Sequence, residues 1–152
     1  MKLNFLAMLL VSGMAAAACA DSEGFILSHP NELKWSDVAS LPPGAKIAVL
    51  EGVMNQAGPI TARLKLPANY KIPAHFHPGI ERVTVLSGTF NYGMGEALDT
   101  TQSKSLVAGS LIVMPPQMRH FAWTSEETVI QLNVTGPWGI TYVNPADDPR
   151  KK

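Results

Sequence analysis

From Lys46 onward, the sequence consists of short apolar runs separated by turn residues, and this pattern limits the fold more than any other feature. The runs are rich in Val, Ile, Thr and aromatic residues, and Gly, Pro, Asn or Ser interrupts them, which is typical of short strands joined by tight turns. No segment after residue 45 has a helical apolar period over ten or more residues. The sequence therefore predicts an all-β domain, either a sandwich or a small barrel.

The length and charge of the chain exclude several classes of protein. With 152 residues, the chain is long enough for one domain with a hydrophobic core but too short for two. Its 12 basic and 12 acidic residues balance, and no basic face stands out. We therefore expect no nucleic-acid partner.

The first twenty residues have the three regions of a secretory signal peptide. Lys2 precedes an apolar stretch at residues 5–11, and small residues follow, so we expect cleavage after Ala18 or Ala20. An anchoring helix is the alternative, but the apolar stretch is shorter than the roughly 20 residues that cross a bilayer. We expect a periplasmic or secreted bacterial protein with no membrane span.

Cys19 is the only cysteine and lies at the expected cleavage site. The sequence AAAC loosely resembles a bacterial lipobox, so a lipid anchor at Cys19 is the alternative to release. Ordinary cleavage is favoured, because a lipobox usually has Leu where Ala16 stands. In either case the mature domain has no disulfide and no thiolate ligand.

These patterns divide the chain into four parts. We expect a signal peptide at residues 1–20, an N-terminal arm at residues 21–44, the β-barrel domain at residues 45–145 and a C-terminal tail at residues 146–152.

Two of the four histidines, His75 and His77, lie two residues apart just before an apolar run. In a strand, alternate side chains share a face, so this spacing brings the two imidazoles together, whereas a helix would need a spacing of four. A turn at Pro78–Gly79 can return Glu81 toward them. Glu81 lies on the apolar face of the next run, and an inward carboxylate needs a metal or another partner.

Imidazoles and a carboxylate that converge on one point form a typical donor set for a divalent metal. A fourth ligand must come from elsewhere, and His120 is the only other histidine beyond residue 30. It follows a strand and a Pro-Pro turn, which can bring it to the first three. His29, in the arm, is expected to be exposed to solvent.

Residues 75–88 resemble the first motif of the cupin family. That motif reads HxH, three or four residues, Glu, six residues and Gly, and the chain matches it at His75, His77, Glu81 and Gly88. The glycine that commonly precedes the motif is replaced by Asn69, and Asn tolerates a positive φ better than most residues.

Residues 109–124 are similar to the second cupin motif, which reads Gly, five residues, Pro-x-Gly, two residues, His, three residues and Asn. The chain matches it at Gly109, Pro115 and His120. It departs from the motif at Gln117, where Gly is usual, and at Thr124, where Asn is usual.

The resemblance covers roughly residues 45–143 and implies a small single-domain cupin. Its fold would be a conical β-barrel, a double-stranded β-helix or jelly roll of two antiparallel sheets, open at one end. It implies one divalent transition metal (Mn, Fe, Zn, Cu or Ni) inside the barrel, a small-molecule ligand and a homodimer. The metal ligands would be His75, His77, Glu81 and His120.

A metal held by four protein ligands keeps positions for a substrate if it is octahedral. We expect a small exported metalloenzyme of the dioxygenase, decarboxylase or lyase type, acting on a small oxygenated molecule. The alternative is a non-catalytic cupin that binds a metal or a small ligand. Tyr92 and Glu96 are candidates for a general base.

One strand assignment stays open at this point. The run at residues 128–134 has two faces, and the inner one is either Ile130, Leu132 and Val134 or Val129, Gln131 and Asn133.

Overall fold

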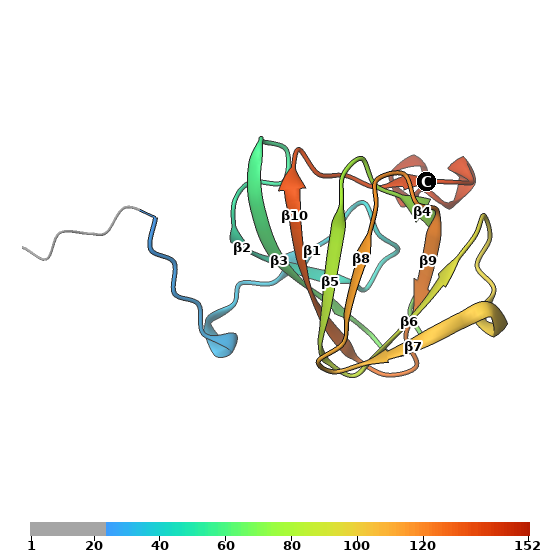
Figure 1. The fold of residues 1–152 in the computed structure, drawn as a ribbon, viewed down its shortest axis with the longest axis horizontal. Helices are drawn as coiled ribbons and strands as arrows, with labels where there is room; N and C mark the ends of the chain where they lie inside the picture. Colours follow the sequence, from blue (N-terminus) through green and yellow to red (C-terminus); the bar gives the residue numbers. More distant parts are fainter. Residues whose placement is uncertain (1–23) are drawn as a thin grey trace, which may run out of the picture.

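The computed structural model describes residues 24–152 (Figure 1). The expected signal peptide, its cleavage sites and the lipid-anchor alternative at Cys19 lie outside the described residues. Within residues 24–152, no helix is long and apolar enough to cross a membrane.

The first sheet has six antiparallel strands. Its longest pair joins two nine-residue strands, from Gly58 opposite Gly136 to Leu66 opposite Thr128. In spatial order, the strands are β1 (Ser36–Asp37), β2 (Lys46–Glu51), β3 (Gly58–Leu66), β10 (Thr128–Gly136), β5 (Glu81–Ser87) and β8 (Leu111–Met114).

The second sheet has five antiparallel strands. In spatial order, they are β11 (Thr141–Tyr142), β4 (Lys71–Phe76), β9 (His120–Trp123), β6 (Thr89–Met94) and β7 (Ser103–Val107). Short 3-10 turns complete the described elements: η1 (Pro30–Glu32), η2 (Thr100–Gln102), η3 (Pro145–Asp147) and η4 (Pro149–Lys151).

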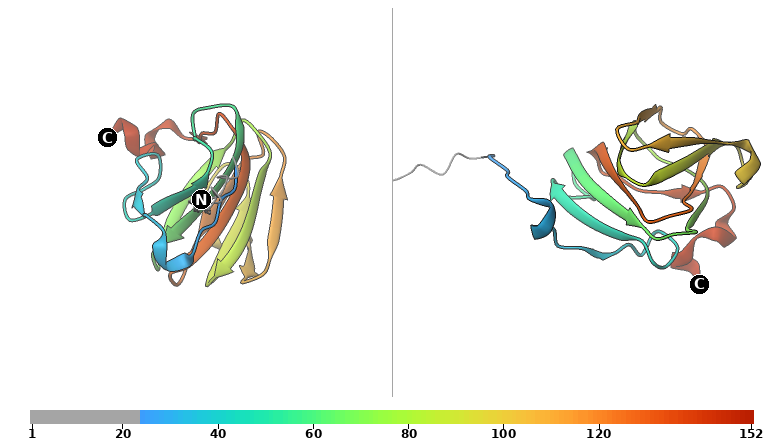
Figure 2. Two further views of the ribbon diagram at one scale, coloured as in Figure 1. Left: turned by 90° about the vertical axis from the view of Figure 1, so that its left-hand side faces the viewer. Right: turned by 90° about the horizontal axis from the view of Figure 1, so that it is seen from below.

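The two sheets curve around a common interior (Figures 1 and 2). Consecutive strands repeatedly change sheets, as β4 and β5 do across the turn at residues 77–80. The predicted fold class, an all-β barrel of two antiparallel sheets, is confirmed.

On β3 and β10, inward and outward side chains alternate as the apolar pattern of the sequence indicates. Along β3, every second residue from Ile60 to Leu66 is buried. On β10 the buried set is Ile130, Leu132 and Val134, which settles the alternative that the sequence left open. Gln131 and Asn133 point outward and bond across the sheet to β3, where Asn133 Nδ2 donates to Thr61 Oγ1 at 3.0 Å.

Residues that precede the boundary expected at residue 45 join the sheet and the core. β1 pairs with β2, and Leu41 belongs to the buried apolar cluster. The Tyr142 hydroxyl, from the other end of the chain, donates to the Ser40 carbonyl at 2.8 Å. Before β1, the chain extends away from the barrel (Figure 1), and the exposed Phe25 lies there.

The two positions that lack the glycine of the motifs still have its backbone conformation. Asn69 has a φ of 58° and Gln117 a φ of 64°. A left-handed φ costs Asn little, whereas Gln has no such advantage. The Gln117 turn is held by its N–H, which donates to the His77 carbonyl at 2.9 Å. This bond connects the segments of the two motifs.

Thr124, the other departure from the second motif, joins the end of β9 to the turn between β3 and β4. Its side chain is fully buried. Its Oγ1 donates to the Pro67 carbonyl at 2.6 Å and accepts from the Tyr70 N–H at 3.3 Å. One hydroxyl thus satisfies two backbone groups of that turn.

We therefore expect Thr124→Val to lower the free energy of unfolding by about 1–3 kcal/mol, because the isosteric change leaves both backbone groups without a partner. Urea denaturation measures the change, and an unaltered m value shows that the transition is the same. Thr124→Ser keeps the hydroxyl and is the matched control. A Val variant as stable as the Ser variant would contradict this role for the hydroxyl.

Candidate metal centre

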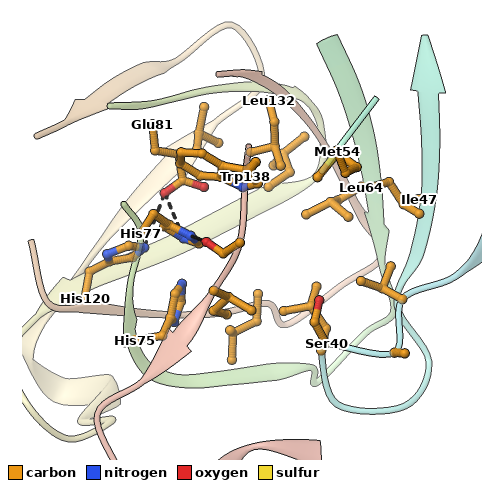
Figure 3. Close-up of a pocket in the computed structure, with 18 of the residues that line it drawn as sticks. Ser40, Ile47, Met54, Leu64, His75, His77, Glu81, His120, Leu132 and Trp138 are labelled. Atoms are coloured by element: carbon orange, nitrogen blue, oxygen red, sulfur yellow. Dashed lines mark hydrogen bonds and ion pairs between the residues drawn. The ribbon is translucent and has the colours of Figure 1, made fainter. Parts of the chain in front are cut away.

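Three histidines converge on one point because their strands are neighbours. His75 on β4 lies directly opposite His120 on β9, and their ring centroids are 4.2 Å apart. His77, two residues after His75, projects from the same face, with its centroid 5.0 Å from that of His75. All three side chains are buried, and each offers a nitrogen within 4.8 Å of the others (Figure 3).

A backbone carbonyl fixes the orientation of each ring. His75 Nδ1 lies 2.7 Å from the Pro73 oxygen, and His77 Nδ1 lies 2.7 Å from the Gly139 oxygen. His120 Nδ1 lies 2.9 Å from the carbonyl oxygen of Met118. Because a carbonyl can only accept, each Nδ1 carries the proton. The Nε2 lone pairs are then left for another partner, which is the usual arrangement of histidines that bind metals.

Burial keeps the imidazoles of His75 and His77 neutral near pH 7. It lowers the pKa of His75 well below its ordinary value, and the neighbouring His120 and His77 lower it further. Burial also lowers the pKa of His77, although the Glu81 carboxylate opposes this effect. Neutral imidazole is the form that binds a metal.

Glu81 comes to the histidines from the other sheet, at the first residue of β5. Its side chain is buried with those of Val83 and Val85, while Arg82 points to solvent, as the alternation of the sequence indicates. Its Oε2 lies 3.4 Å from Nε2 of His77 and 3.4 Å from Nε2 of His120. The four residues named by the sequence analysis thus lie around one point (Figure 3).

The donor atoms suit a cation. Among the described residues, His77 Nε2 and Glu81 Oε2 are buried polar atoms without a hydrogen-bond partner. Such atoms are costly in a protein interior unless something satisfies them. Because both present lone pairs, a shared proton or a metal ion between them would satisfy both. Three imidazole nitrogens and a carboxylate are ligands that divalent transition metals accept. The cluster therefore suggests a metal ion.

Two further residues belong to the site, and no pattern in the sequence identified them. Both lie in the loop after β10. The Trp138 ring stacks on His77 at 4.5 Å between centroids with an interplanar angle of 18°, and Gly139 supplies the carbonyl for His77. The backbone N–H of Trp138 donates to the Met54 carbonyl at 2.7 Å, and this bond holds the loop in place. The only local signal was the turn-forming sequence GPWG.

The donors line one side of a cavity of about 400 Å³. Most of the other lining side chains are apolar. They come from strands of both sheets, from Met54, and from the segments at residues 38–41 and 138–140. Figure 3 shows Ile47, Met54 and Leu64 across the cavity from the histidines. The site can therefore hold a small molecule beside the donor atoms.

The two candidates for a general base lie outside this cavity. Glu96 is exposed and forms an ion pair with Arg119. Tyr92 is buried, its hydroxyl donates to Met118 Sδ at 3.5 Å, and burial raises its pKa. Neither residue lines the cavity. The structure therefore gives no support to either as a base.

Comparison with known proteins gives a consistent picture. A family model described as the ChrR cupin-like domain matches residues 23–138. Germin-like protein 1 of Brassica napus is 32% identical over 114 residues, which are 73% of this chain and 53% of that protein. The chain thus spans about half the length of this relative.

Solved structures resemble the fold. The polyketide cyclase RemF from Streptomyces resistomycificus aligns with a TM-score of 0.68 at 18% identity, over 84% of this chain and 91% of that one. A putative acetylacetone dioxygenase from Methylibium petroleiphilum PM1 aligns with a TM-score of 0.61 at 17% identity, over 93% of this chain and 90% of that one. At these identities the likeness shows the fold alone.

We expect His75→Ala and His120→Ala each to lower the metal content of the purified protein from about one equivalent to a small fraction, because each change removes one imidazole ligand. Elemental analysis of protein purified without added metal measures the content.

The chain offers a matched control in His29, its fourth histidine, which is exposed in the arm. His29→Ala should keep the full metal content. Equal metal in all three variants would show that the cluster is not the binding site.

Proposed function

Because the chain belongs to the ChrR cupin-like domain family, we propose that it is an exported mononuclear-metal enzyme of the dioxygenase, decarboxylase or lyase type. Its substrate would be a small oxygenated molecule. His75, His77, Glu81 and His120 would hold one divalent ion, which is Mn, Fe, Zn, Cu or Ni.

The observation that carries this proposal is the position of the donor set beside an open cavity. Structural metal sites are closed by protein ligands, whereas catalytic sites leave a position for substrate. Here the four donors lie on one side of a cavity of about 400 Å³. An ion with more than four coordination positions would therefore still be accessible to a small molecule.

Different groups of the chain would have different roles in such a site. The ion would supply Lewis-acid chemistry, and a redox-active ion would add electron transfer. The carbonyls of Pro73, Gly139 and Met118 orient the imidazoles. The Glu81 carboxylate lowers the net charge of the site. The apolar walls exclude water, which strengthens electrostatic interactions inside.

The side chains that line the cavity also limit the type of reaction. Apart from the proposed ligands, the ionisable side chains that line the cavity are Asp37 and Arg150, and both are exposed. The interior thus has no separate acid or base among the described residues. This supports reactions that the ion and its ligands can carry, such as oxygenation or decarboxylation. It equally supports the alternative of a cupin that binds a ligand without turnover.

A turnover assay separates the two alternatives. The protein is loaded with iron(II), manganese(II) or zinc and supplied with hydroxy acids, 2-oxo acids and β-dicarbonyl compounds in aerated buffer. Oxygen uptake and carbon dioxide release are measured. We expect at least one combination to turn over, and His120→Ala to abolish that activity while His29→Ala retains it.

A titration with the same metal ions tests the role of Glu81. Glu81→Gln keeps the shape but removes the charge, and it should weaken metal affinity by more than about tenfold, since changes even in groups around a metal site reach that scale. If every loaded form binds members of the panel but consumes none, the binding function replaces the enzymatic one. Full affinity in Glu81→Gln would remove Glu81 from the ligand set.

We also propose that the protein works outside the cytoplasm as a homodimer. The three-part pattern of residues 1–20 supports export. Exposed apolar side chains on β8, an edge strand of the six-stranded sheet, support association between copies: Leu111 and Val113 are 62% and 52% exposed.

Native mass spectrometry of the exported protein tests both statements. We expect a mature chain that begins at residue 19 or 21, and a native mass of twice that chain. A retained leader would contradict export, a lipid-sized mass addition at Cys19 would show anchoring instead of release, and a monomer would contradict the dimer.

A further inference from the structure

We propose that the ligand of this site is a hydrophobic molecule with one oxygen-donor head group: the head reaches the metal and an apolar body fills the rest of the cavity. This inference rests on the proposed function, because it places the head group at the ion. It goes further by assigning the chemical class of the molecule.

The first argument is the distribution of polar groups. Among the buried side chains that line the cavity, the polar ones are those of His75, His77, His120 and Glu81. The other lining side chains that are not exposed are aliphatic or aromatic, except for Ser40. A ligand with several hydroxyl or charged groups along its body would lose its hydrogen bonds to water and find at most the Ser40 hydroxyl as a partner there. Only one end of the ligand can be polar.

The second argument concerns the charged residues at the opening. The Arg150 guanidinium is already hydrogen-bonded within its own segment. Its Nε donates to Asp148 Oδ1 at 2.7 Å, and its Nη2 donates to Asp148 Oδ2 at 2.9 Å. Nη2 also donates to the Ile140 carbonyl at 3.1 Å. Asp37, also at the opening, is held by Lys46 at 2.6 Å. These paired charges do not form a second site for an ionic group of the ligand.

The third argument is size. A volume of about 400 Å³ falls within the range of small-molecule sites. It is far larger than a two-carbon acid requires. A compact polar substrate would leave most of the apolar wall in contact with water, whereas an aliphatic or aromatic body would bury it. The ligand must therefore extend from the donors toward Met54 and Leu64, on the opposite side (Figure 3).

A homologous series of straight-chain carboxylates tests the inference. The protein is loaded with cobalt(II), because its visible spectrum reports directly on a carboxylate that enters the coordination sphere. Acetate, butanoate, hexanoate and octanoate are titrated below their micelle concentrations. We expect affinity to rise about fourfold per methylene group, the factor expected for burying each one, until the chain fills the cavity.

Two variants locate the apolar body. Met54→Glu puts a charge on the side of the cavity away from the histidines, and it should lower the ratio of octanoate to acetate affinity by more than about tenfold. Val107→Glu makes the same change at an exposed residue at the end of β7, outside the cavity, and should leave the ratio unchanged. Met54→Leu should retain the chain-length effect. All comparisons use proteins with confirmed full cobalt content.

The outcomes separate this inference from the proposed function. If all four acids alter the cobalt spectrum with equal affinity, the hydrophobic ligand is excluded while the open metal site stands. If cobalt binds but no acid alters its spectrum, the open site and this inference both fail. If octanoate binds equally well without cobalt, the head group is not at the metal and the inference is overturned.

Discussion

The site depends on the antiparallel pairing of β4 with β9. This pairing sets His75 opposite His120, and the strand direction then places His77 on the same face. Three carbonyls hold the Nδ1 atoms, so a ring cannot turn without losing a hydrogen bond. The bond from the Gln117 N–H to the His77 carbonyl fixes the exit from β4. The donor atoms are therefore oriented by the backbone, and little reorganisation is needed when a ligand arrives.

Glu81 belongs to the cluster but comes from the opposite sheet. A cation shared by Glu81 and the histidines would link β5 of one sheet to β4 and β9 of the other. A carboxylate is expensive to bury, and a positive ion offsets that cost. Metal binding and barrel stability should therefore be coupled, since an ion that binds only the native state stabilises it by mass action.

The cavity is formed partly by segments that precede and follow the main barrel strands. Residues 37–41 and the loop at residues 138–140 line it together with Arg150, and the Tyr142–Ser40 hydrogen bond joins the two segments. Protein interiors are normally close-packed, so space left beside a donor set is a departure that a ligand can use. The barrel supplies the donors and much of the wall, and the two flanking segments complete the volume that a ligand could fill.

The sequence by itself determined the strand content and singled out three imidazoles and a carboxylate as candidate ligands. Alternation and the HxH spacing are local patterns, and His120 followed from the resemblance of residues 109–124 to the second motif. It also placed Glu81 on an inward face. Only the tertiary structure decided which face of β10 is buried, since the outward Gln131 and Asn133 find partners on β3, 68 and 72 residues away in sequence. It likewise brought Trp138 and Gly139 to His77 and left Glu96 at the surface. These outcomes depend on contacts between distant segments, which no local pattern encodes.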